Sequence, residues 1–173
     1  MTNEEIIQFW GEESLLRWQP QAVVATALPE DVRHFLTQVG LPRGLDWSID
    51  FNTDAGDLNE LQGYPGYYVI GSDMGPEWMC VDATRSSRVV SISIDPRSQA
   101  ASIQFVNSNV HLLAEFLVLY QKYRLTVEGL DEKRARSLVD ETRRQMVARD
   151  PVALTVSNSF WTSMIEEMYI GWM

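Results

Sequence analysis

The sequence predicts an α+β fold in which a central antiparallel sheet of about five to six strands carries helices on one face. Apolar residues recur with helical spacing in the first and last thirds of the chain, whereas in the middle third they alternate as in strands. The connections between the strand-like segments are short and contain no helical stretch, which indicates an antiparallel meander. With 173 residues, 45% of them hydrophobic, we expect a single domain spanning residues 1–173.

Two helices are expected before the sheet. The first extends from Asn3 to Trp18 despite an interruption at Gly11, and a connector follows at Gln19–Pro20. We treat residues 1–20 as an N-terminal helical extension. The second helix begins at Leu28–Pro29, because proline fits the first position of a helix. The helix is expected to end at Gly40, because glycine commonly terminates helices. Its apolar face consists of Val32, Phe35, Leu36 and Val39.

Five strands are expected in the centre of the chain. Gly-, Pro-, Asp- and Ser-rich clusters separate them, as is typical of tight turns. The predicted strands are Trp47–Phe51, Tyr67–Ile70, Trp78–Val81, Val89–Ile94 and Ser102–Val106.

Three helices are expected after the sheet. The first is capped by Asn107 or Ser108 and has the widest apolar face, so it should be the most buried. A charged helix follows over residues 131–149 and ends before Pro151. A last helix covers residues 159–170, and its apolar face, with Trp161 and Trp172, fits a core position. A dimer face is the alternative, so the oligomeric state stays open between a monomer and a weak dimer.

No catalytic residue is predicted. His34 and His111 lie in expected helices without the spacing of a catalytic or zinc motif, and surface or cap positions suit them better. Cys80 lies in a predicted strand, where cysteine behaves as a small apolar residue. An enzyme would need one of these groups to meet a carboxylate in a cleft of the folded chain.

No metal ion or other cofactor is predicted either. The stretch Asp50–Asp54 opens like an EF-hand calcium loop, but Ala55 and Leu61 replace the glycine and the glutamate that such a loop requires. Glycine-rich nucleotide-binding motifs do not occur in the sequence. The stretch is better interpreted as an Asp- and Asn-rich loop.

The net charge of −10 restricts the partners. Nucleic acid and anionic membrane surfaces would be repelled, whereas a basic protein would be attracted. The sequence has no apolar run long enough to cross a membrane, and its acidic start is unlike a secretory signal, so we expect a cytoplasmic protein. A general contribution to solubility is the alternative explanation of the charge.

The acidic residues are concentrated in one segment. Between Gly44 and Thr84 the chain has eight acidic residues and no Lys, Arg or His, and two aromatic residues lie in or beside its loops. Acidic residues with interleaved aromatics suit the capture of a basic protein surface. The alternative is that these carboxylates are solvated loop residues that never meet. The candidate partner-binding residues are Asp46, Asp50, Asp54, Asp57, Glu60, Tyr64, Asp73, Glu77, Trp78 and Asp82.

Four short motifs, in order, resemble the SUKH superfamily, and most closely its fourth immunity subgroup. The resemblance covers residues 28–172, although the turn Met74–Glu77 contains less glycine than expected. The motifs are Leu28-Pro29 with Val39-Gly40-Leu41-Pro42, Tyr68-Val69-Ile70-Gly71-Ser72-Asp73 with Met79-Cys80-Val81-Asp82, Phe105-Val106-Asn107-Ser108 before Phe116-Leu117, and Phe160-Trp161-x-x-Met164-Ile165-Glu166-Glu167.

The resemblance implies an α+β fold and a role as a bacterial immunity protein that blocks a toxin by binding it. Many toxins of such systems are nucleases or nucleic-acid deaminases, and the family has no catalytic motif to carry over. We therefore expect a cognate toxin with a basic surface as the partner. Because other members of the superfamily are regulators or adaptors, a regulatory or scaffold protein that binds a host partner is the alternative.

Overall fold

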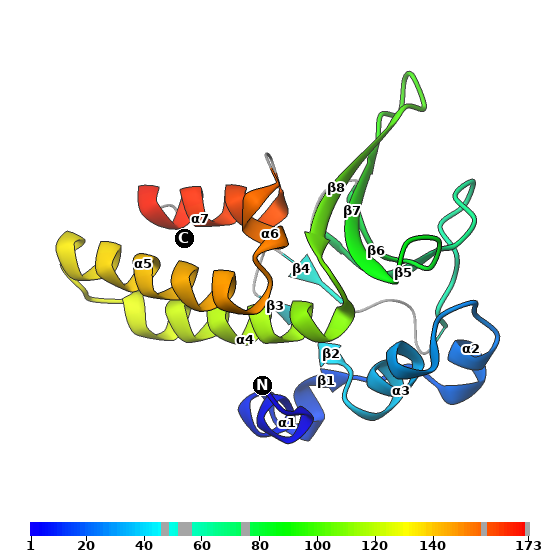
Figure 1. The fold of residues 1–173 in the computed structure, drawn as a ribbon, viewed down its shortest axis with the longest axis horizontal. Coiled ribbons are helices and arrows are strands. Elements are labelled where there is room, and N and C mark those ends of the chain that lie inside the picture. The colour runs from blue at the N-terminus through cyan, green and yellow to red at the C-terminus, as the bar shows by residue number, and fades with distance from the viewer. Residues whose placement is uncertain (46–48, 52–56, 74–76, 157–158, 172–173) are drawn as a thin grey trace.

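The computed structural model describes residues 1–45, 49–51, 57–73, 77–156 and 159–171 (Figure 1). Short elements come first, followed by a sheet and then by long helices. The helices are α1 (Asn3–Trp10), α2 (Pro20–Val24), α3 (Glu30–Gln38), α4 (Val110–Val127), α5 (Glu132–Arg149), α6 (Val152–Thr155) and α7 (Phe160–Ile170), with a 3-10 turn at Glu12–Ser14. The strands are β1 (Leu15–Leu16), β2 (Leu41–Pro42), β3 (Gly44–Leu45), β4 (Ile49–Asp50), β5 (Tyr67–Asp73), β6 (Glu77–Asp82), β7 (Arg88–Ile94) and β8 (Ala101–Asn107).

The central sheet has six strands in the order β3-β4-β5-β6-β7-β8, and every neighbouring pair is antiparallel. The predicted α+β fold with an antiparallel meander is therefore confirmed. β4 is shorter than the strand predicted over residues 47–51, and Trp47 lies outside the described residues. β1 and β2 form a separate antiparallel pair.

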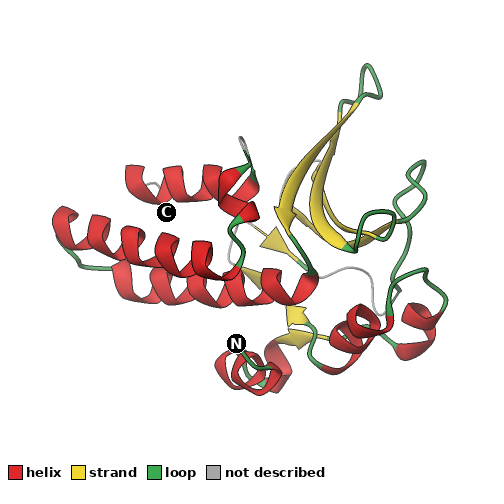
Figure 2. Ribbon diagram, viewed as in Figure 1, coloured by secondary structure: helices red, strands yellow, loops and turns green. Residues whose placement is uncertain are grey.

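Helices cover one face of the sheet, which we call the inner face (Figure 2). Met79, Val81 and Val89 of the strands belong to the same buried cluster as the apolar residues of α4 and α7. α4 is the most extensively buried helix, with ten buried residues, as its wide apolar face predicts. The inner face is thus the main hydrophobic core.

The opposite, outer face carries a smaller cluster. Leu61, Cys80, Val90 and Ile92 are buried there, and four half-buried side chains pack around them: Tyr64, Tyr67, Val69 and Ile94. None of the described helices contributes a residue to this cluster. The outer face is therefore partly apolar, and no helix of the described part of the chain packs on its cluster.

The N-terminal prediction was wrong in two respects. The first helix ends at Trp10 rather than Trp18, because Gly11 has a φ of 77° that a helix does not accept. The expected connector at Gln19–Pro20 is instead the start of the short helix α2, which has Gln19 as its N-cap and Pro20 in its first turn. The segment still belongs to the fold, since Ile6, Leu16 and Trp18 are part of the main core.

The start of α4 also differs from the prediction. Its N-cap is Asn109, whose side chain accepts a hydrogen bond from the Leu112 N–H at 2.9 Å. The two predicted caps are engaged elsewhere, since the Asn107 Nδ2 and the Ser108 hydroxyl both donate to the buried Asp150 carboxylate. Tertiary contacts thus displaced the cap by one or two residues.

The two later helices agree with the prediction. Asp131 caps α5 and Ser159 caps α7, each accepting a hydrogen bond from a backbone N–H of the first turn. The apolar face of α7 is core, as preferred, with Trp161 fully buried, whereas Trp172 lies outside the described residues. Among the described helices, none has the length and apolarity needed to span a bilayer.

Candidate functional site

One row of side chains crosses the outer face of the sheet from strand to strand. Cross-strand partners share a face, and the register pairs Asp50 with Ser72, Ser72 with Trp78, Trp78 with Ile92, and Ile92 with Ile103. Trp78 is 42% exposed and Ile103 is 45% exposed, whereas Ile92 between them is buried. Two strand spacings, roughly 10 Å, separate the exposed Asp50 from Trp78. We call this set the outer row.

Three other predicted residues lie at one side of the outer row. The exposed Asp57 and Glu60 precede β5 along the chain, and residues 59–61 bond to the same edge of β5 as β4 does. The Glu60 carboxylate accepts a hydrogen bond from the Gly66 N–H at 3.0 Å. The half-buried Tyr64 packs on the outer cluster. The structure therefore places these three residues beside the acidic end of the outer row.

Two predicted residues are positioned differently. Glu77 lies on the inner face, opposite Ser93, and its carboxylate accepts a hydrogen bond from the Ser91 hydroxyl at 3.2 Å. Asp82 is fully buried and bonds to Thr84 and Arg88, so burial withdraws it from any contact surface. Asp82 is therefore withdrawn as a candidate contact residue, because the sequence did not reveal that Thr84 and Arg88 bind its carboxylate in the interior.

The remaining predicted residues cannot be assigned to the surface. Asp46 and Asp54 lie outside the described residues. Asp73 is placed only through its backbone, which pairs with Ile49 at the end of β5.

Sequence reasoning missed Ile103. Its exposure follows from the alternation of β8, in which Ile103 pairs with Ile92 of the outer cluster and is 45% exposed. The signal was present in the sequence, since alternating strands in a meander leave one face without helices. The candidate residues were chosen from the acidic segment between Gly44 and Thr84, which does not include β8.

The groups considered for catalysis do not assemble into one centre. Cys80 is buried under the outer face, and burial raises the pKa of its thiol to about 12. His34 and His111, by contrast, line the same hollow of about 930 Å³ between α3 and α4. The two histidines thus line one hollow, and Cys80 is not among the residues that line it. Within the described part of the chain, no group of three or more His, Cys, Asp and Glu could hold a metal ion.

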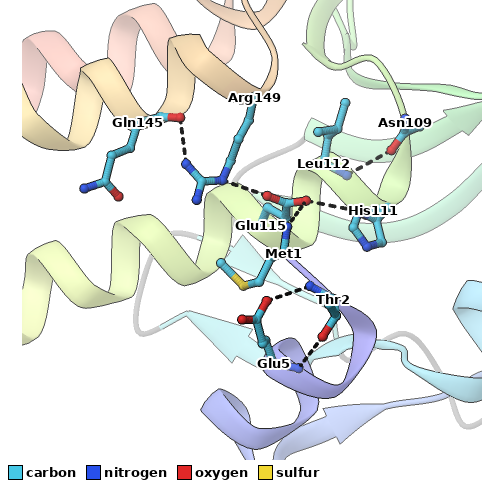
Figure 3. Close-up of polar contacts among 9 residues, drawn as sticks. All are labelled: Met1, Thr2, Glu5, Asn109, His111, Leu112, Glu115, Gln145 and Arg149. Carbon is cyan, nitrogen blue, oxygen red and sulfur yellow. Dashed lines mark hydrogen bonds and ion pairs between the residues drawn. The ribbon is translucent and has the colours of Figure 1, made fainter.

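His111 belongs to a charge cluster centred on Glu115 (Figure 3). Three nitrogen atoms contact the buried Glu115 carboxylate. The N-terminal ammonium nitrogen of Met1 lies 3.0 Å from a carboxylate oxygen, Nδ1 of His111 3.3 Å and Nε of Arg149 2.7 Å. Arg149 also donates to the backbone carbonyl of Gln145. The cluster joins the N-terminal residue before α1 to α4 and α5, and its cations neutralise a carboxylate that burial would otherwise destabilise.

Burial lowers the pKa of His111, and the N-terminal ammonium group adds to this effect, whereas Glu115 opposes it. The imidazole is therefore harder to protonate than a solvated histidine. Its neighbour Glu115 is already held by two other cations, so the arrangement is that of a structural ion cluster and not of an acid–base pair with a nucleophile.

The sequence model of the SUKH-4 immunity protein family matches residues 1–167. The chain belongs to the SUKH-4 immunity protein family. The resemblance noted in the sequence is therefore confirmed, including the fourth subgroup. No curated protein and no solved structure matches the chain.

The match gives this SUKH-4 protein an immunity function and, with it, a cognate toxin as the partner. It starts at residue 1, so it includes the segment that the sequence analysis treated as an extension. This agrees with the packing of Ile6 and Trp18 in the main core. Immunity families act in general by binding. An exposed contact surface such as the outer row is therefore a better candidate for the functional site than the histidine hollow.

Proposed function

We propose that this SUKH-4 protein neutralises its cognate toxin by contact, without turnover, and that the outer row with its acidic end forms the contact surface. The observation that supports this most strongly is the outer row itself. It combines exposed apolar groups, Trp78 and Ile103, with the carboxylate of Asp50 on a sheet face whose apolar cluster includes no residue of the described helices. Asp57 and Glu60 extend the acidic end.

The energetics of protein interfaces favour this arrangement. A few buried aromatic anchors supply most of the affinity of an interface, and tryptophan is among the most frequent of them. Surrounding carboxylates contribute more to the association rate and to specificity than to affinity. Trp78 fits the first role, and Asp50, Asp57 and Glu60 fit the second.

The charge supports a toxin that acts on nucleic acid. A nuclease or a nucleic-acid deaminase needs a basic site to hold phosphates, and an acidic protein can cover such a site. The net charge of −10 would accelerate the encounter at low ionic strength. We accordingly propose that the protein is not an enzyme and that it acts in the cytoplasm, where such a toxin meets its substrate.

Charge reversal at the acidic end tests the contact surface. The double variant Asp50→Lys/Asp57→Lys should slow association with the toxin domain encoded by the adjacent gene by at least about tenfold at low salt, and the difference should shrink as salt is added. Glu166→Lys/Glu167→Lys on α7 is the matched control, because it changes the net charge equally at exposed residues of a helix on the inner-face side. Equal slowing by both variants would reject the acidic end as a specific contact and leave only a net-charge effect.

Removal of the aromatic anchor tests the apolar part of the same surface. Trp78→Ala should weaken binding by at least about tenfold, mainly through faster dissociation. Ile170→Ala, which removes an exposed apolar side chain at the end of α7, should leave binding unchanged. Unchanged affinity of the Trp78 variant would move the interface away from the outer row.

A further inference from the structure

β8 is the last strand in the order β3-β4-β5-β6-β7-β8, so among the described residues one of its two edges has no strand partner. Helices α4, α6 and α7 contact β8, but its first three residues, Ala101, Ser102 and Ile103, are exposed. In Figure 1 this end of the β7–β8 hairpin projects beyond the helices. An edge of this kind is available to another strand.

The sequence of β8 lacks the usual protection of an edge. Proteins normally block exposed edges with lysine, proline, a bulge or a very short strand, because open edges pair with other chains. β8 has seven residues, Ala-Ser-Ile-Gln-Phe-Val-Asn, with no charge and no proline. Its one irregularity lies at the opposite end, between Val89 and Val90 of the partner strand. The exposed half is therefore uncharged, and the register shift lies outside it.

The register of β7 and β8 determines which backbone groups of β8 point away from β7, toward the open edge. The Asp95 N–H donates to the Ala100 carbonyl at 3.0 Å, so this pair is a hydrogen-bonded pair of the hairpin. Bonded and non-bonded pairs alternate in an antiparallel ladder. Ile94 with Ala101 and Ile92 with Ile103 are then non-bonded pairs. The N–H and C=O groups of Ala101 and Ile103 consequently point away from β7.

The two sides of this edge differ in chemistry. On the outer face, Ile103 and Trp78 are exposed apolar groups. On the inner face, a hollow of about 410 Å³ contains the Glu77 carboxylate together with hydroxyl groups of Ser91, Ser93 and Ser102. The described residues that line the hollow include no Lys or Arg, and they give Glu77 no ion pair. A cationic side chain would fit this hollow.

We propose that the toxin domain adds a strand to the edge of β8. The strand would bond to the outward groups of Ala101 and Ile103 and would alternate apolar side chains toward Ile103 with a Lys or Arg side chain toward the hollow that contains Glu77. The inference rests on the proposed function and adds the mode of binding to it. The edge adjoins the outer row, so both belong to one continuous contact surface.

A second copy of the chain fits the edge less well. Two β8 strands paired edge to edge would bring two Glu77 hollows together, and β8 itself offers no cation for either of them. The toxin, with the basic surface expected of a nucleic-acid enzyme, supplies what the hollow lacks. Charge complementarity therefore selects the toxin strand as the occupant.

Amide hydrogen exchange tests the mode of binding without any substitution. In the isolated protein the amides of Ala101 and Ile103 should exchange fast, whereas the ladder amides of Ser102 and Gln104 should be protected. In a complex with the inactivated toxin domain encoded by the adjacent gene, Ala101 and Ile103 should become at least about a hundredfold slower. If the complex forms and both amides stay fast, strand addition is wrong while the immunity function stands.

Two other outcomes are equally informative. Absence of any complex would contradict the proposed function itself. Protection of Ala101 and Ile103 in the isolated protein, growing with its concentration, would identify a second copy as the occupant and overturn the proposal.

A pair of variants separates backbone pairing from side-chain contact. Ile103→Pro removes the outward N–H, which β7 does not use, and Ile103→Thr keeps it while removing a similar apolar surface. Strand addition predicts that the proline variant loses at least about tenfold more affinity than the threonine variant. Equal losses would indicate side-chain contact alone. Urea unfolding of both variants shows whether they are folded before binding is compared.

Discussion

Cys80 and Trp78 lie two residues apart on the same face of β6, yet the fold gives them opposite properties. Cys80 is fully buried in the outer cluster, whereas Trp78 remains 42% exposed at the end of the strand. The sequence predicted the structural role of the cysteine from its apolar neighbours. It also predicted the exposed tryptophan from the adjacent turn. It could not show that Asp82, in the same strand, is buried and forms an ion pair with Arg88.

Native Cys80 should be almost inert toward thiol reagents. Burial raises its pKa from 9.0 to about 12, so at pH 8 the reactive thiolate is about a thousandfold rarer than for an exposed thiol, and access is blocked as well. Labelling with a chromogenic disulfide reagent should be slow in buffer and fast in urea. Rapid labelling of the folded protein would contradict the burial and reopen a chemical role for this residue.

His111 should make the free energy of unfolding depend on pH. Because burial holds its pKa below the unfolded value of 6.5, the unfolded chain binds a proton first as the pH falls. Stability is therefore expected to fall from about pH 6.5 downward, until the folded state also binds the proton. The charged groups that face or adjoin His111 are Glu115, the N-terminal ammonium group, Arg149, Glu30, Asp31 and His34.

Urea unfolding at pH 7 and pH 5 measures this dependence. His111→Gln should lose less stability between the two values than the unmodified protein does. His34→Gln is the control, because it removes the other histidine of the same hollow. A His111 variant with an unchanged pH dependence would show that other groups of the cluster titrate instead.

At the scale of the elements, helices and strands with strong patterns were predicted well, and their ends were not. α3, α5 and α7 follow their apolar stripes closely, and α5 and α7 also begin at capping side chains, because each signal lies within or beside the element itself. The start of α4 depends on Asp150, which is 42 residues away from Ser108 in sequence. A single sequence does not show that Asp150 and Ser108 lie close together in space.

The same polar network should be important for stability. Asp150 is 2% exposed and accepts hydrogen bonds from Asn107 and Ser108, while Asn107 accepts one from the Trp161 indole. Asp150→Ala would leave these donors without partners in the interior and should reduce the free energy of unfolding by about 2–4 kcal/mol. Glu132→Ala, at an exposed ion pair on the same helix, should cost no more than about 0.5 kcal/mol. Similar losses for both variants would contradict the role assigned to the network.

At the scale of the whole molecule, the sequence predicted the layers but only part of the surface. The periodicity change from helix to strand and back to helix determined the α+β architecture, since it extends over many residues. Which face of the sheet a strand residue occupies depends on the register of the strands, which the sequence alone does not give. The register separated Glu77 from Trp78, although they are adjacent, and brought Asp50 of β4 into one row with Ile103 of β8.

The charge of the whole molecule and the face without helices lead to the same expectation. A toxin with a basic site would be attracted by the net charge of −10 and would dock where apolar groups are exposed beside carboxylates.

Co-expression with the product of the adjacent toxin gene tests the central claim most directly, scored by growth and by co-purification. We predict that the intact protein rescues growth and purifies with the toxin domain as a one-to-one complex, and that Trp78→Ala weakens both results while Ile170→Ala preserves them. Failure of the folded, intact protein to bind the toxin or to rescue growth would contradict neutralisation by contact. That result would favour a regulatory protein of the same fold with a host partner.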